Sequence, residues 1–322
     1  LHGPDVQVDS AGIDSRAVRP GELFVPIVAA RDGHDFIPAA VAAGAAAYLT
    51  DRAPDPAVPA SAVQVPDTFH ALADLGREAR RRLLDRVVGV TGSVGKTSTK
   101  DLLAGVLATT YRTAASEKSF NNELGLPLTL LGAPDDTEAV VLEMGARGVG
   151  HIALLCEIAS PTVGVLTRVE GVHLEMFGSL ADVAQAKGEL VESLPPAEEG
   201  GAAILNADDP LVRAMATRTK AKVILFGESG EADVRAENVR LTDSGQPSFS
   251  LHTPSGASDV TMRLYGEHHV SNALAAAAVA HELGMSADEI ARALSEAGSL
   301  SRWRMEVTER PDGVTVVNDA YN

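Results

Sequence analysis

The stretch VVGVTGSVGKTSTK, residues 87–100, decides the fold of the central part of this chain. Its valines form a β-branched run typical of a buried strand, the turn Gly92-Ser93-Val94-Gly95 follows, and the helical run LLAGVLA occupies residues 102–108. Glycines let a backbone approach a phosphate closely, and a helix N-terminus presents free N–H groups and a positive dipole end. The sequence therefore predicts a strand, a phosphate-binding turn and a helix in succession.

Lys96 and Thr97, directly after the turn, match the end of a nucleotide-binding phosphate loop. In the pattern G-x-x-x-x-G-K-[ST] the lysine reaches the terminal phosphates and the hydroxyl holds Mg²⁺. The match is incomplete, because Val90 stands where the pattern has glycine and Gly89 lies one residue earlier. An ordinary glycine-rich turn is the alternative, but the strand, Lys-Thr pair and helix together favour the phosphate loop.

Composition excludes several classes of protein. The formal net charge is −17, which argues against a general nucleic-acid-binding protein, because phosphate backbones require a basic surface. The single cysteine, Cys156, allows no disulfide framework and is expected to be a small buried hydrophobe in a reducing compartment. No apolar run approaches the roughly 18 residues of a membrane span, and no signal peptide opens the chain, so a cytoplasmic protein is expected.

Three regions are expected along the 322 residues. Residues 1–85 form an N-terminal unit with short strands, an Ala-rich helical stretch IPAAVAAGAAAYL, a loop at 55–62 before the strand VQVP, and the helix ALADLGREARRRLL. Residues 86–309 form a central domain, and residues 310–322 begin a third. Because the chain lacks an initiator methionine and stops abruptly at Asn322, we expect a fragment at both ends.

Strands and helices alternate in the central region, which predicts a mostly parallel, doubly wound α/β sheet. The predicted strands are 87–91, 138–143, 162–167, 202–205 and 222–226, and the predicted helices are 99–109, 179–193 and 272–283. Residues 233–265 alternate in polarity and predict a small antiparallel part of two or three strands. Ser286 and Glu289 predict a capping box at the start of a short helix, and a last strand begins at residue 314.

Three side chains are candidates for chemistry at the carboxyl edge of this sheet, where such folds bind ligands. Glu143 ends the strand AVVLE; a buried carboxylate needs a partner, and Mg²⁺ opposite a phosphate loop is a natural one, a solvated strand end being the alternative. His173 follows the strand TVGVLTRVEG and could equally be an ordinary surface or core histidine. Lys187 lies among small residues, with a snorkelling surface lysine as the default interpretation.

Eight segments, in this order, resemble the Mur ligase family, the cytoplasmic ATP-dependent enzymes that form amide bonds in peptidoglycan assembly. They are TGSVGKTSTK, SFNNELGLPLTLL, LEMGARGVGHI, VHLEMFGS, AQAKGEL, LNADDP, GEHHVSNALAAAAVA and NDAYN. The N-terminal segments DSR, GELFV and DGHDF resemble the family's UDP-sugar-binding domain. The resemblance implies a small N-terminal α/β substrate domain, a central ATP-binding domain, and a C-terminal Rossmann-like domain that we expect to be absent here.

The segment NDAYN is similar to the type that adds D-Ala-D-Ala to UDP-N-acetylmuramoyl-tripeptide, through an acyl phosphate and with release of ADP and phosphate. That type would use ATP and Mg²⁺ and is expected to be a monomer without membrane insertion. The alternatives are a related Mur-type ligase with another acceptor or amino component, a phosphate-loop switch or kinase, and a non-catalytic nucleotide-binding module. The fragment as supplied is expected to be inactive.

The resemblance also implies roles for single residues. Catalytic roles are implied for Lys96, Lys187, His173 and Asn122, and Mg²⁺ binding for Thr97, Glu143, His173 and Lys187, the lysine as a carbamate. Nucleotide contacts are implied for Gly92, Ser93, Gly95, Lys96, Thr97, Ser98, Asn206, Asn272, Arg304 and Asp319. Acceptor contacts are implied for Ser15, Arg16, His34, Asp35, Asn121 and Asn122.

Three places depart from the family pattern. Thr97-Ser98-Thr99 replaces the commoner Thr-Thr-Thr and keeps a hydroxyl. Arg168 stands where the family usually has asparagine, and its guanidinium could contact phosphate or simply pair with Glu170. Trp303 replaces a usual glycine beside Arg304.

Overall fold

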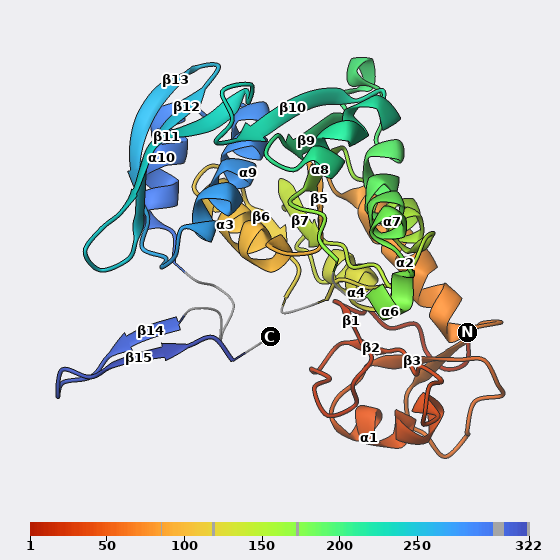
Figure 1. Cartoon of the computed structure of the whole chain (residues 1–322). Coiled ribbons are helices and arrows are strands. Elements are labelled where there is room, and N and C mark those ends of the chain that lie inside the picture. Colours follow the sequence, from red (N-terminus) through yellow and green to blue (C-terminus); the bar gives the residue numbers. More distant parts are fainter. Residues whose placement is uncertain (85, 118–119, 172–173, 299–305, 321–322) are drawn as a thin grey trace. The chain divides into compact units, whose positions relative to one another are not determined.

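The computed structural model describes residues 1–84, 86–117, 120–171, 174–298 and 306–320, and Figure 1 labels its helices and strands. The chain divides into two compact units, one of residues 1–83 with 123–135 and one of residues 84–122 with 136–322. The segment 123–135 contains α4 (Gly125–Leu131) and belongs to the first unit, although the chain on either side of it belongs to the second. The sequence had not predicted this return to the first unit.

The first unit is a four-stranded parallel sheet with helices on both faces. Its strands, in spatial order, are β1 (Ala11–Gly12), β2 (Leu23–Phe24), β3 (Ala47–Thr50) and β4 (Ser61–Gln64). The short helices η1 (Gly33–Phe36) and α1 (Ile37–Ala42) pack on the face that carries Phe24 and Tyr48. Helices α2 (Thr68–Arg82) and α4 cover the face that carries Leu23 and Leu49.

The helix predicted for IPAAVAAGAAAYL is wrong in its second half. Helix α1 ends at Ala42, and Gly44 adopts a φ of +110°, which favours glycine and ends the helix. The following residues form β3, in which Tyr48 and Thr50 are typical of a strand and all four residues are buried. The loop at 55–62 therefore joins two strands instead of a helix and a strand.

The second unit is built on one nine-stranded sheet, as the sequence predicted for its parallel and antiparallel parts. The spatial order is β13 (Gly256–Thr261), β12 (Pro247–Thr253), β11 (Val234–Leu241), β10 (Lys222–Gly227), β9 (Ala202–Asn206), β8 (Val163–Leu166), β5 (Val87–Thr91), β7 (Ala139–Glu143) and β6 (Thr113–Ala115). The strands from β11 to β6 are parallel, and β12 and β13 extend the same sheet in antiparallel fashion. Strand β6 is short and was not predicted.

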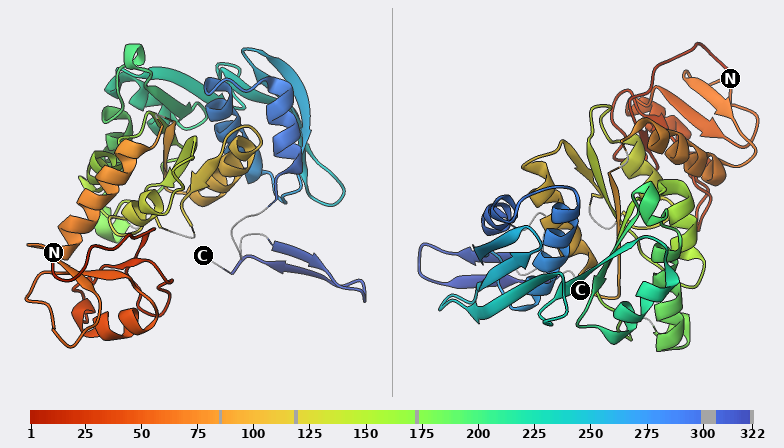
Figure 2. Two further views of the ribbon diagram at one scale, coloured as in Figure 1. Left: turned by 180° about the vertical axis from the view of Figure 1, so that it is seen from behind. Right: turned by 90° about the horizontal axis from the view of Figure 1, so that it is seen from above.

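Helices cover both faces of this sheet, as Figure 2 shows from two further sides. The face of Val88 and Val90 packs against α3 (Lys96–Ala108), α9 (His268–Glu282) and α10 (Ala287–Glu296). The capping box of Ser286 and Glu289 is present at the start of α10, as predicted. Further helical segments are α5 (His151–Ala159), α6 (Leu174–Phe177), α7 (Leu180–Glu192), η2 (Ala197–Glu199), α8 (Pro210–Ala214) and η3 (Met215–Arg218), and β14 (Glu306–Glu309) pairs with β15 (Thr315–Asn318).

Two glycines on the opposite face let α7 lie close to the sheet. Gly89 in β5 and Gly164 in β8 are direct neighbours in the strand register. A Cβ atom at Gly89 would lie 3.1 Å from Leu190 Cδ1, and one at Gly164 would lie 3.0 Å from Leu190 Cγ. Since α7 carries Lys187, these glycines help to set how far that lysine stands from the strands.

Composition led to expectations about the single cysteine and about membrane-spanning helices. Cys156 is buried in α5, where burial raises the pKa of its thiol to about 12, which confirms a small buried side chain instead of a reactive one. Within the described residues, no helix combines the length and the apolar character needed to cross a membrane.

The close packing of α7 can be tested with a larger side chain. We expect Gly164→Val to lower the free energy of unfolding by about 2–4 kcal/mol, because its methyl groups would overlap the side chains of Leu190 and Leu194. Urea denaturation followed by circular dichroism measures this change.

Gly105→Ala is the matched control. Gly105 lies inside α3, and a Cβ atom there meets no atom within 4 Å, so we expect a gain of about 0.5–1 kcal/mol. A tolerated Gly164→Val would contradict the packing described here.

Candidate functional site

The phosphate loop has the geometry that its glycines predict. Gly92 has a φ of +150°, and a Cβ atom there would lie 2.0 Å from Thr167 Oγ1. Gly95 has a φ of +83° at the N-cap of α3, and its Cβ would lie 2.6 Å from Asn272 Oδ1. Larger residues are therefore excluded at both positions, and the N-terminus of α3 stays open to an anion.

The segment after β8 braces this loop. The backbone N–H of Ser93 donates to the carbonyl of Arg168 at 2.7 Å, and Ser93 Oγ exchanges two 2.9 Å hydrogen bonds with the backbone of Glu170. Thr167 Oγ1 donates to the carbonyl of Val94 at 2.6 Å. The loop is thus fixed by neighbouring backbone before any ligand binds, which lowers the ordering cost of binding.

Lys96 and Thr97 occupy the first turn of α3. Lys96 Nζ donates to the carbonyls of Gly92 and Ser93 at 2.7 and 3.0 Å, so its ammonium lies over the loop. Thr97 is buried, and Ser98 is half-buried beside it. A phosphate bound on the loop would compete with the two carbonyls for the lysine ammonium.

Glu143 is buried at the end of β7, with only 2% of its surface exposed. Its Oε1 accepts a 2.9 Å hydrogen bond from Asn121 Nδ2, whereas Oε2 is buried and meets no hydrogen-bond donor in the described part of the chain. Burial without a partner is costly for a carboxylate oxygen. The alternative of a solvated strand end is therefore wrong, and the free oxygen fits Mg²⁺, which prefers such ligands.

Further polar groups form hydrogen bonds around the end of β7, where Glu143 lies. Ser116 Oγ accepts a hydrogen bond from the backbone N–H of Glu143 at 3.2 Å, and Lys100 Nζ donates to the carbonyl of Ser116 at 2.9 Å. Lys100 also forms a buried ion pair with Asp101 at 2.7 Å. The sequence alone did not point to these three residues, although Lys100 ends the quoted stretch 87–100 and Asp101 follows it directly.

Lys187 is buried in α7 with 4% of its surface exposed, so the surface-lysine interpretation is wrong. Burial, and then the charge of Lys96, lower the pKa of its amine to about 7, while the carboxylates of Glu143 and Glu189 act in the opposite direction. The structure therefore brings Lys96, Glu143 and Lys187 into one electrostatic neighbourhood. A substantial fraction of the amine is neutral near pH 7, which is its nucleophilic form.

Glu189 is a further buried carboxylate that the sequence analysis did not single out. Its two oxygens accept hydrogen bonds from the backbone N–H groups of Gly150 at 2.5 Å and Ala153 at 3.0 Å, at the N-terminus of α5. This contact ties the segment that follows Glu143 to the helix that carries Lys187. The sequence could have indicated Glu189 as a residue of the site only through its position, two residues after Lys187.

A cleft of about 460 Å³ lies next to the phosphate loop. Its lining residues are Val94, Gly95, Thr167, Arg168, Glu228, Glu267, His268, Ser271 and Asn272. Asn272, a predicted nucleotide contact, thus lines the cleft and also accepts a hydrogen bond from Thr99 Oγ1 at 3.2 Å. Asn206 is fully buried, and its amide bonds the carbonyl of Thr167 and the N–H of Asp208, so it braces the cleft wall.

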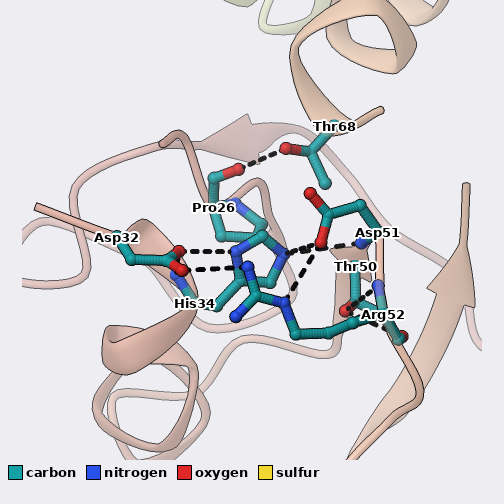
Figure 3. Close-up of polar contacts among 7 residues, drawn as sticks. All are labelled: Pro26, Asp32, His34, Thr50, Asp51, Arg52 and Thr68. Carbon is teal, nitrogen blue, oxygen red and sulfur yellow. Dashed lines mark hydrogen bonds and ion pairs between the residues drawn. The ribbon is translucent and has the colours of Figure 1, made fainter. Parts of the chain in front are cut away.

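The predicted acceptor residues of the first unit differ in environment. Figure 3 shows His34 held between two carboxylates, with Nδ1 2.7 Å from Asp32 Oδ1 and Nε2 3.2 Å from Asp51 Oδ1. Arg52 bridges the same two aspartates, and the hydrogen bonds from His34, followed by Arg52, lower the pKa of Asp32 to about 2. Both ring nitrogens of His34 are engaged, so its ring supports the loop, whereas Asp35 is exposed.

The remaining predicted residues lie at exposed or half-buried positions or outside the described residues. Arg16 is exposed and bonds both carboxylate oxygens of Asp14, next to the half-buried Ser15. Asn122 is half-buried beside Asn121, and Asp319 is exposed after β15. His173, Trp303 and Arg304 lie outside the described residues.

Comparisons with known proteins agree with this arrangement. The family described as "Mur ligase middle domain" matches residues 90–280, and "Mur ligase family, catalytic domain" matches residues 7–80. The UDP-N-acetylmuramoyl-tripeptide–D-alanyl-D-alanine ligase of Mycobacterium tuberculosis is 44% identical over 96% of this chain, and the ligase of that name from Escherichia coli is 36% identical over the whole chain. This chain spans 64% and 70% of their lengths.

Two solved structures are similar over 99% of the chain. MurF from Acinetobacter baumannii has a TM-score of 0.88 at 31% identity, with 69% of its chain covered. MurF ligase from Thermotoga maritima, in complex with ADP, has a TM-score of 0.83 at 31% identity, with 73% of its chain covered.

The buried amine of Lys187 predicts a pH-dependent stability. In the unfolded chain it stays protonated up to about pH 10.5, whereas in the folded chain it loses its proton near pH 7. The loss of folding stability caused by burying the charged Lys187 amine is thus complete below pH 7, and it decreases as the pH rises toward 10.5. We expect Lys187→Met to raise the free energy of unfolding by roughly 2–4 kcal/mol at about pH 6, and by less at each higher pH.

Urea denaturation in carbon-dioxide-free buffer at several pH values measures this difference. Lys220→Met is the matched control, because Lys220 is exposed and its replacement should have a small effect at every pH. A difference between parent and Lys187→Met that does not change with pH would contradict a buried amine.

Proposed function

Because this chain belongs to the Mur ligase family, we propose that it carries the N-terminal and central parts of an ATP-dependent ligase that adds D-Ala-D-Ala to UDP-N-acetylmuramoyl-tripeptide. The names of the relatives from M. tuberculosis and E. coli support this specificity, and the two MurF structures support the same assignment. Family membership also removes the reason to consider a phosphate-loop switch or kinase.

One observation carries the proposal. In the described part of the chain, Glu143 buries a carboxylate oxygen that no hydrogen-bond donor meets, in the electrostatic neighbourhood of Lys96 and Lys187. A fold tolerates such a cluster when a cation and an anionic ligand complete it. MgATP on the phosphate loop supplies both.

In the proposed reaction, the terminal carboxylate of the acceptor attacks the γ-phosphorus of ATP, and ADP leaves. The resulting acyl phosphate is attacked by the amine of the dipeptide, and phosphate leaves from the tetrahedral intermediate. No protein nucleophile is needed, so the chain's part is positioning and charge compensation. Lys96 balances charge on the transferred phosphoryl group, and the rigid loop from Gly92 to Gly95 fixes its position.

Mg²⁺ would be held by Glu143 and the hydroxyl of Thr97, and when bound it would withdraw charge from the phosphate oxygens. In the described residues no three His, Cys, Asp or Glu side chains gather into a metal site, so phosphate oxygens are needed as further ligands. We also propose that the neutral amine of Lys187 adds to the carbon of carbon dioxide and releases a proton, and that the resulting carbamate gives the site an anionic oxygen donor. His173 stays a predicted metal ligand.

The other roles are proposed on the resemblance. Asn272 and Ser98 would contact the nucleotide, with Asn206 bracing the cleft and Arg304 and Asp319 contributing from the C-terminal side. Ser15, Arg16 and Asp35 would contact the UDP-muramoyl acceptor, and His34 would hold their domain in shape. Asn121 would orient Glu143, and Asn122 would face the reacting groups. A cytoplasmic monomer fits the reaction's soluble substrates.

A substrate panel tests the specificity. With the full-length protein and ATP, we expect phosphate release from UDP-N-acetylmuramoyl-tripeptide together with D-Ala-D-Ala, and at least about 100-fold less with a single amino acid, because the missing contacts remove several kcal/mol of transition-state binding. Phosphate release by a coupled colorimetric assay measures the rates.

The panel also includes UDP-N-acetylmuramoyl-dipeptide with single amino acids. Turnover on that pair, and none on the tripeptide with D-Ala-D-Ala, would contradict the proposed substrate and favour the related ligase with another acceptor. Absence of phosphate release on every pair would contradict the ligase activity itself.

A further inference from the structure

We propose that Arg168 is a nucleotide-binding residue of this chain, and that its guanidinium contacts the phosphate groups of bound ATP. This inference rests on the proposed use of ATP and adds a contact that the family pattern does not supply, since that pattern has asparagine here. The sequence left two alternatives, a phosphate contact or a pair with Glu170. The structure favours the first for three reasons.

Hydrogen bonds hold the backbone of Arg168 and of the residues before and after it. Its carbonyl accepts the hydrogen bond from Ser93 of the phosphate loop, while the preceding carbonyl, that of Thr167, is bonded by Asn206 Nδ2 at 2.7 Å. The following N–H, that of Val169, donates to Asp209 Oδ2 at 2.8 Å. The side chain is therefore presented from a fixed point directly beside the phosphate loop.

Arg168 also lines the cleft of about 460 Å³ next to that loop. Two carboxylic acids, Glu228 and Glu267, line the same cleft, and burial, followed by the charges of Asp208 and Glu267, raises the pKa of Glu228. The surroundings of the cleft are therefore rich in negative charge. Arg168 is the one arginine or lysine among the described lining residues, so it is the group that offsets this charge for an anionic nucleotide.

The alternative partner holds the guanidinium only weakly. Arg168 Nη1 lies 3.5 Å from Glu170 Oε1, and the two side chains are 48% and 45% exposed. An exposed pair at this distance contributes little to stability, whereas a guanidinium donates strong, geometrically specific hydrogen bonds to phosphate. The pair leaves the side chain available to a bound nucleotide.

Isothermal titration of the 322-residue chain with MgATP and with adenosine tests the proposal. We expect Arg168→Gln to weaken MgATP binding about tenfold, the loss typical of one charge-assisted hydrogen bond, and to leave adenosine binding within about twofold. Arg168→Lys keeps the charge and should retain most of the MgATP affinity. Glu170→Gln is the matched control and should bind both ligands as the parent does.

Each other result overturns the assignment. MgATP binding by Arg168→Gln within about twofold of the parent would show that no phosphate contact exists. An equal loss of affinity for MgATP and adenosine would mean that the substitution disturbs nucleoside binding or the fold. The melting temperature of each variant distinguishes these two causes. A parent chain that binds no MgATP would contradict the proposed function as well, whereas the first two results leave that function intact.

Discussion

The register between β5 and its two neighbours is the constraint on which the site depends. Val90 pairs with Glu143 of β7, and Thr91 pairs with Leu166 of β8. This pairing places three segments at one edge: the phosphate loop after β5, the carboxylate that ends β7, and the bracing segment that starts at Thr167. A slip by one residue would turn Glu143 to the other face of the sheet, so the register and the site are specified together.

The site also contains buried ionisable groups that the surrounding described residues stabilise only in part. Among the described residues, no donor meets the buried Oε2 of Glu143, and Lys187 is a buried amine whose pKa falls to about 7. The buried Glu189 and the Lys100–Asp101 pair, in contrast, are fully engaged by backbone or by each other. These engaged groups brace the scaffold, whereas the buried charges of Glu143 and Lys187 mark a place that ligands can complete.

The sequence predicted the long, regular parts of the fold well and the contacts between distant residues poorly. The strands around residue 90 and the helices after them have strong periodicity, and they lie where predicted. The Ala-rich stretch near residue 44 misled because alanine favours a helix, while one glycine and the neighbouring sheet decided otherwise. The roles of Asn206, His34 and Glu189 depend on tertiary hydrogen bonds, which leave no periodic signal in the sequence.

In the proposed function, Glu143 gives its second carboxylate oxygen to a magnesium ion that accompanies ATP on the phosphate loop. The most direct measurement is the dissociation constant of ATP for the 322-residue chain with and without Mg²⁺, compared between the parent and Glu143→Gln. We expect Mg²⁺ to tighten ATP binding to the parent and to have much less effect on the variant, while both remain folded. An equal effect of Mg²⁺ on the two proteins would contradict it.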